Sequence, residues 1–86
     1  VKMVGATSGR QSGSIVNIGV KKVYRNVVFG NLLQVDMDTQ LGDSGTALFD
    51  TDRRVIGILM GNENEYSYFI PITMILDFFQ MQLLTN

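Results

Sequence analysis

The sequence predicts an all-β fold: a six-stranded antiparallel barrel with a C-terminal α-helix. Short apolar, β-branched runs alternate with glycine-rich or polar turns at about 8–12-residue spacing. The 86 residues include nine glycines and a single proline, which suits many short strands and fits one domain over residues 1–86. Near the end, the apolar period changes from two residues to three and four. Closing a sheet into a barrel removes its exposed edges.

The strand predictions follow the turn signals along the chain. Residues 6–13 have turn-forming residues at nearly every position, so this segment is predicted as a loop, as is 61–65. Gly19 marks an expected bulge and Gly30-Asn31 an expected kink. The fifth run is nearly all apolar and is expected to be buried on both faces. The six predicted strands cover residues 1–4, 14–24, 27–37, 46–49, 54–60 and 66–72.

The tail predicts one amphipathic helix over residues 73–84. Thr73 is a suitable N-cap directly after the strand that contains Pro71. The segment has no basic residue, which argues against a helix lying on a membrane surface and favours packing on the core. The apolar side chains at helical spacing are Ile72, Ile75, Leu76, Phe79 and Leu83.

Composition narrows the function classes. Seven basic and eight acidic residues nearly balance, which argues against nucleic-acid binding. No apolar run reaches the ~18 residues of a membrane span. The chain has no cysteine and no histidine, so disulfides, the commonest general base and the commonest zinc ligand are excluded; no metal or cofactor is expected. The start at Val1, without an initiator methionine or signal segment, suggests a piece of a longer protein.

Charge is unevenly distributed along the chain. Residues 1–35 contain five bases and no acid, whereas residues 36–86 contain eight acids and two arginines. This asymmetry fits two solvated sides of one barrel, or a basic edge that meets an acidic partner.

The chemical signal is Gly42-Asp43-Ser44-Gly45, between the third and fourth predicted strands. Gly42 permits a tight turn with positive φ. Successive N–H groups in such a turn can converge on one point, beside which Ser44 would present its hydroxyl. A hydroxyl next to converging N–H donors is half of an acyl-transfer site. The alternative interpretation is a plain turn between two strands.

The segment also resembles the nucleophile loop of the chymotrypsin/trypsin-like serine proteases. The resemblance continues through the small apolar strand after the serine and through a strand similar to the one that lines the family's substrate cleft. It ends in a strand, proline and helix like those that end the bacterial and degradative members. With the opening hairpin, it covers nearly the whole chain in the order of the C-terminal barrel of these proteases. The matching segments are residues 5–16, 42–50, 55–61 and 66–72.

This resemblance implies roles for particular residues. Ser44 would be the nucleophile, and the loop Gly42-Asp43-Ser44 would form the oxyanion hole through the N–H groups of Gly42 and Ser44. Asp43 would order the loop through an ion pair or hydrogen bond. The backbone of Leu59, Met60 and Gly61 would bind substrate as an added strand.

The resemblance also bears on specificity. Asp38 lies where trypsin-like members place the base of the primary specificity pocket, which would favour Arg or Lys in the substrate. Alternatively, Asp36 and Asp38 alternate outward along a strand. Ser67 stands where many members have glycine, so the pocket is expected to be narrower.

The family places its catalytic His and Asp on an N-terminal barrel that this chain lacks. Serine is a weak nucleophile without an adjacent base, and the spacing gives no support to Lys21 or Lys22 in that role. We therefore expect a serine endopeptidase half that is inactive alone, with an N-terminal barrel as partner and a peptide or protein as substrate.

Two other interpretations stay open: a non-catalytic peptide-binding or dimerisation module of the same fold, and an unrelated β-barrel. An uncovered apolar face would favour a homodimer or a partner chain.

Overall fold

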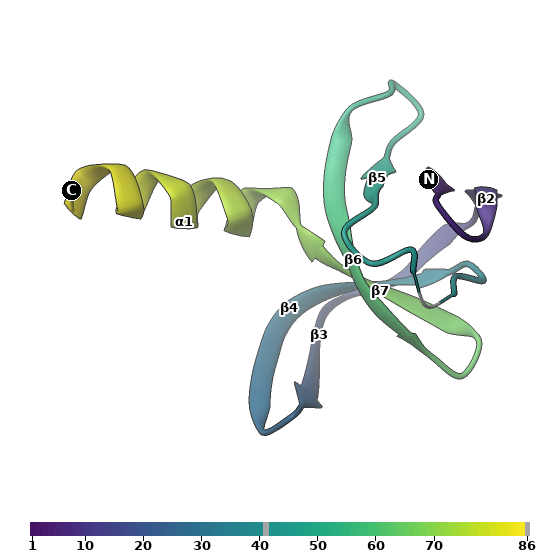
Figure 1. The fold of residues 1–86 in the computed structure, drawn as a ribbon, viewed down its shortest axis with the longest axis horizontal. Coiled ribbons are helices and arrows are strands. Elements are labelled where there is room, and N and C mark those ends of the chain that lie inside the picture. The colour runs from purple at the N-terminus through teal and green to yellow at the C-terminus, as the bar shows by residue number, and fades with distance from the viewer. Residues whose placement is uncertain (41, 86) are drawn as a thin grey trace.

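The computed structural model describes residues 1–40 and 42–85, and within the final helix it describes the side chains through Asp77 and that of Gln80. The described chain forms seven β-strands followed by one α-helix (Figure 1). The mainly β fold with a C-terminal helix is therefore as predicted. The elements are β1 (Lys2–Gly5), β2 (Gly9–Ser12), β3 (Ser14–Tyr24), β4 (Val27–Asp36), β5 (Ala47–Phe49), β6 (Val55–Glu63), β7 (Tyr66–Pro71) and α1 (Ile72–Thr85).

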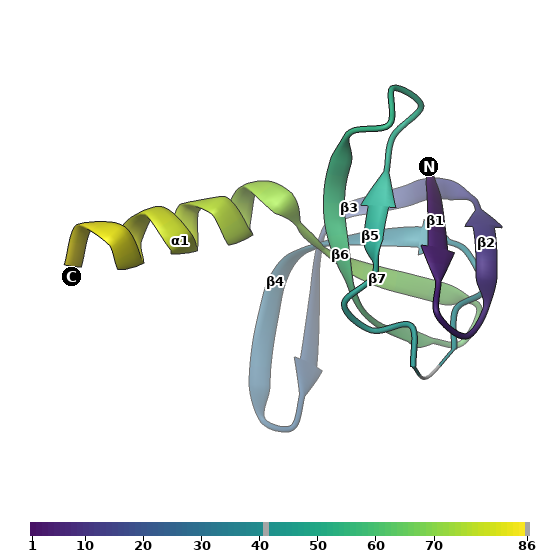
Figure 2. The same cartoon turned by 45° about the horizontal axis from the view of Figure 1, so that its top comes forward.

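The described strands form one open antiparallel sheet in the order β2-β1-β5-β6-β7-β4-β3 (Figure 2). The predicted six-stranded closed barrel is wrong, because a seventh strand is present and no ladder joins the edge strands β2 and β3. The extra strand comes from residues 6–13, predicted as a loop: residues 9–12 pair with β1 as a hairpin. Since β2 and β3 follow each other across Gly13 alone, they cannot lie side by side as ladder partners.

Gly13 connects β2 and β3, the two edge strands of the sheet. Its N–H donates to the carbonyl of Val1 at 3.0 Å, and its carbonyl accepts from the Val1 amine at 2.9 Å. A Cβ at this position would lie 2.0 Å from the carbonyl oxygen of Asp36, at the end of β4. Glycine is therefore required here by close approach of a neighbouring strand.

Two of the predicted strands pair as the β3–β4 hairpin. Arg25 and Asn26 at its tip both have positive φ, 50° and 64°, the pattern of a tight turn whose twist matches the strands. The predicted bulge at Gly19 is confirmed, because the pairing register shifts between Asn17 and Val20. The predicted kink at Gly30-Asn31 corresponds to a further register shift and to a φ of 56° at Asn31.

The core lies where β1, β4, β5, β6 and β7 contribute alternate side chains, as expected for a sheet with one buried face. The expected burial of run 54–60 on both faces holds only in part, since Leu59 is buried whereas Val55 is 38% exposed. The buried cluster consists of Met3, Val35, Met37, Leu48, Leu59 and Phe69.

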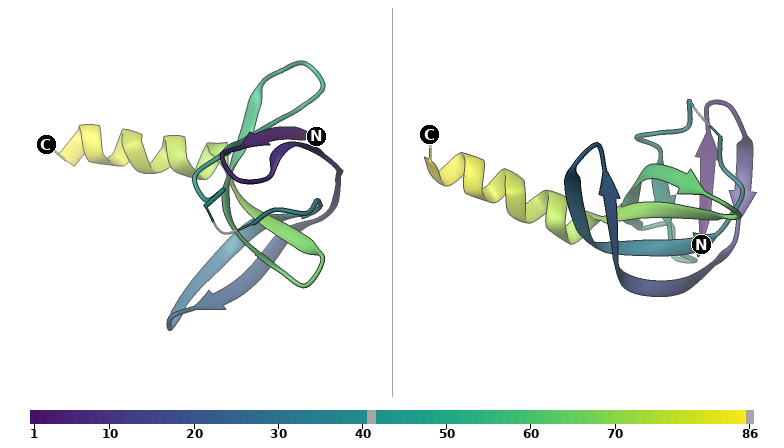
Figure 3. Two further views of the ribbon diagram at one scale, coloured as in Figure 1. Left: turned by 45° about the vertical axis from the view of Figure 1, so that its right-hand side comes forward. Right: turned by 90° about the horizontal axis from the view of Figure 1, so that it is seen from below.

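The C-terminal helix forms close to its predicted bounds but extends away from the sheet (Figures 1 and 3). It contacts β6 and β7. Ile72 and Ile75 are half-buried, while Met74 and Leu76 are 39% and 54% exposed. Among the described side chains, the prediction that this helix packs on the core thus holds only in part, for Ile72 and Ile75.

The side chains of Phe79 and Leu83 lie outside the described part of the chain. None of the described helices has the length and apolar character required to cross a membrane.

Candidate nucleophile loop and pocket

Ser44 lies on the loop between β4 and β5, and its side chain is exposed. Gly42 has a φ of +101°, as predicted from its place in the turn. A Cβ at Gly42 would also lie 2.5 Å from the Thr7 hydroxyl oxygen, in the β1–β2 turn. Both the backbone conformation and the space around it therefore require glycine, and the resulting bend lifts the Ser44 hydroxyl to the surface.

Asp43 fastens this loop to the β1–β2 turn. Its side chain is fully buried, and one carboxylate oxygen accepts the backbone N–H groups of Thr7 at 2.8 Å and Ser8 at 3.1 Å. The other oxygen accepts the N–H of Gln40 at 3.0 Å. Gly5 makes room, because a Cβ there would lie 2.4 Å from the carboxylate. Asp43 orders the loop through hydrogen bonds rather than an ion pair.

These contacts favour the charged form of the carboxyl. The hydroxyl of Ser8, buried beside the carboxylate without ideal hydrogen-bond geometry, contributes most, followed by the N–H groups of Gln40, Thr7 and Ser8. Together they hold the pKa of Asp43 well below its usual range, although burial acts in the opposite direction. The loop is therefore built around a permanent buried negative charge.

On its other side the loop is joined to β6. The N–H of Gly45 donates to the Leu59 carbonyl at 2.9 Å, and the Leu59 N–H donates to the Thr46 carbonyl at 2.9 Å. The Leu59 side chain is also buried. The backbone of Leu59, predicted to bind substrate, is thus already paired with the loop, whereas Met60 and Gly61 remain at the surface of a pocket.

Two backbone donors of the loop have no such partner. Among the described residues, no backbone carbonyl accepts the N–H of Gly42 or Ser44 outside the regular strands. By contrast, the Asp43 N–H donates to the Gln40 carbonyl at 3.0 Å, which closes the turn. The N–H groups of Gly42 and Ser44, which are predicted to form an oxyanion hole, therefore make no hydrogen bond that closes the turn.

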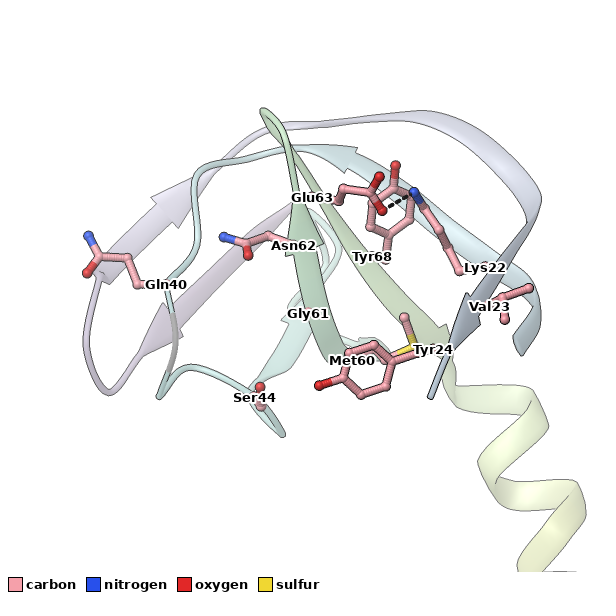
Figure 4. A pocket seen from close by; sticks show the side chains of 10 residues that line it. All are labelled: Lys22, Val23, Tyr24, Gln40, Ser44, Met60, Gly61, Asn62, Glu63 and Tyr68. Carbon is pink, nitrogen blue, oxygen red and sulfur yellow. Dashed lines mark hydrogen bonds and ion pairs between the residues drawn. The ribbon is translucent and has the colours of Figure 1, made fainter. Parts of the chain in front are cut away.

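An open pocket of about 210 Å³ lies beside Ser44, between the loop, β6 and the tip of the β3–β4 hairpin (Figure 4). Figure 4 shows Met60 and Tyr24 beside each other, and Lys22, Glu63 and Tyr68 together at a separate part of the pocket. The full lining is Lys22, Val23, Tyr24, Gln40, Ser44, Met60, Gly61, Asn62, Glu63 and Tyr68.

Lys22 is the one basic residue among those that line the pocket with Ser44, but it is engaged elsewhere. Its Nζ lies 2.6 Å from a carboxylate oxygen of Glu63 and 4.4 Å from the centre of the Tyr68 ring. The hydrogen bond to Glu63, with a smaller contribution from Tyr68, raises the pKa of Lys22. Lys22 therefore stays protonated near neutral pH and cannot accept the serine proton, so a Ser-Lys pair gains no support.

The two residues predicted to shape the specificity pocket do not reach it. Asp38 is exposed, as is Asp36, which matches outward alternation along the chain. Ser67 is fully buried; its hydroxyl donates to the Met37 carbonyl at 2.7 Å and lies 2.7 Å from the Thr39 hydroxyl. Ser67 thus fastens residues 37–39 to β7.

Asn62 strengthens the same junction through a hydrogen bond from its side-chain nitrogen to the Thr39 carbonyl. The segment before the loop is consequently fastened to β6 and β7, and Asp38 is not among the residues that line the pocket.

Sequence reasoning missed Tyr24, Glu63 and Tyr68 as pocket residues, and it considered Lys22 only as a possible base. Lys22 and Glu63 are 41 residues apart in the sequence, so only the fold of the sheet brings them together. The complementary charges of Lys22 and Glu63 were the available signal. Within residues 1–40 and 42–85, no group of three side chains is placed to hold a metal ion.

Comparison with known proteins gives no family assignment. A scan against protein-family models matches no family, and a search of curated proteins finds no significant match.

Proposed function

We propose that this chain is the C-terminal half of a trypsin-like serine endopeptidase and supplies its nucleophile, Ser44. The observation that carries the proposal is the loop itself. An exposed serine hydroxyl follows a left-handed glycine, and the neighbouring Asp43 is fully buried on three backbone N–H groups. A plain surface turn has no need for such an anchor, whereas a nucleophile must be held in one position.

The proposed chemistry is acyl transfer. Ser44 Oγ attacks the scissile carbonyl carbon while its proton passes to a histidine on a separate N-terminal barrel, oriented by an aspartate there. The N–H groups of Gly42 and Ser44 stabilise the resulting oxyanion, each donor contributing about 3–4 kcal/mol in such sites. The peptide C–N bond then breaks, the histidine protonates the leaving amine, and water releases the acyl group from Ser44.

The strand order agrees with that of the antiparallel barrel that this function requires. The edge strands β2 and β3 are consecutive and are separated only by Gly13. Counted as one bent strand, they connect β1 to β4, so that the sheet returns on itself through β7, β6 and β5. The sheet itself is open, but its strand order is the one that a small antiparallel barrel would have if one strand were broken at Gly13.

The pocket indicates how a peptide would bind. The ladder between β5 and β6 reaches Ile58, so Met60 and Gly61 lie beyond it and have β7 on one side only among the described strands. An extended peptide added at this edge would place a side chain against Met60, Tyr24 and Tyr68. Because Asp38 is exposed elsewhere, the proposed preference is for an apolar side chain rather than Arg or Lys.

The test is labelling with a fluorophosphonate probe, which reacts with activated serines. The 86-residue chain is mixed with the N-terminal barrel of a bacterial trypsin-like protease that carries the His and Asp. We expect labelling of the mixture, none of either chain alone, and loss of labelling in Ser44→Ala. Ser14→Ala, which removes another exposed serine, is the matched control. Labelling that survives Ser44→Ala would contradict the proposal.

A second candidate is a peptide-binding module without catalysis. The pocket contains no histidine, and its lysine is held by Glu63, which favours this candidate. It predicts that apolar peptides bind with equal affinity to the wild-type chain and to Ser44→Ala, and that no added barrel produces labelling. Fluorescence anisotropy with a labelled peptide measures this affinity.

A further inference from the structure

Two elements leave the body of the sheet without a covering layer. The first is the outer part of the β3–β4 hairpin, because β4 pairs with β7 only from Leu33 to Val35. Beyond that point, the hairpin is a two-stranded ribbon, as Figures 1 and 2 show. Such a ribbon alone is at best marginally stable in water.

The ribbon exposes large apolar side chains. Val23 and Val28 are cross-strand partners, so they share one face, and they are 71% and 66% exposed. Tyr24 and Val27 form the next pair, on the opposite face of the ribbon, and are 56% and 52% exposed. An apolar surface of this kind usually marks a contact site.

The second uncovered element is α1. It has 14 residues, and an isolated helix of that length is marginal in water. Apart from its first turn it extends into solvent, with Met74 and Leu76 exposed (Figure 3). Its single charged residue is Asp77.

We propose that two copies of this chain associate reciprocally, the helix α1 of each copy packing across the β3–β4 ribbon of the other. Each chain carries one ribbon, and one helix whose described side chains beyond Ile75 lack cover, so a two-fold exchange covers both elements and leaves neither unpaired. The dimensions agree: 14 helical residues span about 21 Å, and the six residues 27–32 of β4 span about 20 Å.

Charge supports the same pairing. Lys21 on the ribbon is exposed and makes no ion pair among the described residues, while Asp77 is the one charge on the helix. The ribbon meets the helix of the other copy with opposite charges, whereas ribbon against ribbon or helix against helix would bring like charges together. The dimer does not depend on the proposed catalytic role.

The experiment measures the mass of the chain by sedimentation equilibrium over a range of concentrations. We expect a dimer, weakened by about tenfold or more in Val28→Glu on the ribbon and in Leu76→Glu on the helix. The matched control is Val4→Glu on β1, because Val4 is 64% exposed but lies outside both surfaces. Circular dichroism verifies that each variant keeps its fold.

Mixing the two variants distinguishes this dimer from other arrangements. In a reciprocal dimer of Val28→Glu with Leu76→Glu, the intact helix of the first meets the intact ribbon of the second, so one of two contacts survives. We expect the mixture to associate more strongly than either variant alone. Equally weak association in the mixture, a monomer at all concentrations, or a dimer unaffected by both substitutions would overturn the proposal. So would a monomer that binds phosphatidylserine vesicles through these residues.

Discussion

The loop around Ser44 and the β3–β4 ribbon, both part of one sheet, differ in what they bury and what they expose. Around the loop, polar groups are buried and find partners: Asp43 on three N–H groups, and Ser67 on Met37 and Thr39. Along the ribbon, apolar side chains such as Val23 and Val28 face solvent. The first region is held in place by its own chain. The second has a surface suited to contact with another molecule.

The sharpest test of this contrast compares a core residue with a ribbon residue. Phe69 has no exposed surface, so Phe69→Ala leaves a cavity and should cost about 3–5 kcal/mol of unfolding free energy. Val23→Ala, at a site 71% exposed in the single chain, should change the stability of the monomer, measured at protein concentrations too low for a dimer, by less than about 0.5 kcal/mol. Urea unfolding of both variants measures the difference. A comparable loss in Val23→Ala would mean that the ribbon is covered within the single chain.

The next effect concerns the buried charge. Asp43→Asn places an amide where N–H donors converge, so the melting temperature should fall and the loop should lose its anchor. Because the folded-state pKa of Asp43 is lowered, its carboxylate stabilises the fold above its usual pKa of about 4, and this contribution is lost as pH falls below that value.

The pH dependence of this loss should be shallower in Asp43→Asn than in the wild-type chain. Asp50→Asn serves as control: the pKa of Asp50 is also lowered, chiefly by the backbone N–H of Arg54, but Asp50 lies in the β5–β6 turn. Calorimetry from neutral to acidic pH measures all three proteins. Identical acid profiles for the wild-type chain and Asp43→Asn would contradict this assignment.

A smaller difference in unfolding free energy is expected between substitutions of Ser67 and of Ser44. Ser67→Ala leaves the buried Met37 carbonyl and Thr39 hydroxyl without their partner and should cost about 1–3 kcal/mol. Ser44→Ala removes an exposed hydroxyl and should change stability by less than about 0.5 kcal/mol. Chemical denaturation monitored by tyrosine fluorescence gives both values. The opposite order would mean that Ser44 has a structural role.

The smallest expected effect is that of the ion pair at the pocket. Lys22→Gln removes the contacts with Glu63 and Tyr68, and a partly exposed pair of this kind contributes at most about 1 kcal/mol. The loss should shrink at about 1 M salt, where charges are screened. Denaturation at low and high salt tests this, with Lys2→Gln as the matched control, because Lys2 is exposed and makes no ion pair among the described residues. A loss that does not change with salt would indicate packing of the lysine stem instead.

Much of the fold could be predicted because its signals are local. The bounds of β3, the bulge at Gly19 and the helix after Pro71 follow from residue types a few positions apart. The strand β2 was missed because glycine and serine in residues 9–12 favour turns, and only pairing with β1 makes them a strand. The packing of α1 was predicted only in part because apolar periodicity indicates that one face of a helix will be covered. It does not indicate which element of the protein, or which other molecule, covers that face.

The candidate site was predictable to a similar extent. The left-handed conformation of Gly42 and the anchoring role of Asp43 follow from the short motif around Ser44. The partners of Asp43 at Thr7 and Ser8, about 35 residues away, depend on where the sheet brings the first hairpin. For the same reason the sequence could not show that Asp38 points outward while Ser67 is sealed.

Gly13 has no side chain, and this allows Val1 at the start of the chain and Asp36 at the end of β4 to approach the same point of the backbone. The backbone there touches the Asp36 carbonyl on one side and exchanges two hydrogen bonds with Val1 on the other. A single methyl group at this point would act as a wedge, forcing the terminal strand and the end of β4 apart. That one substitution would then disturb both β1 and β4, although these two strands are not neighbours in the sheet.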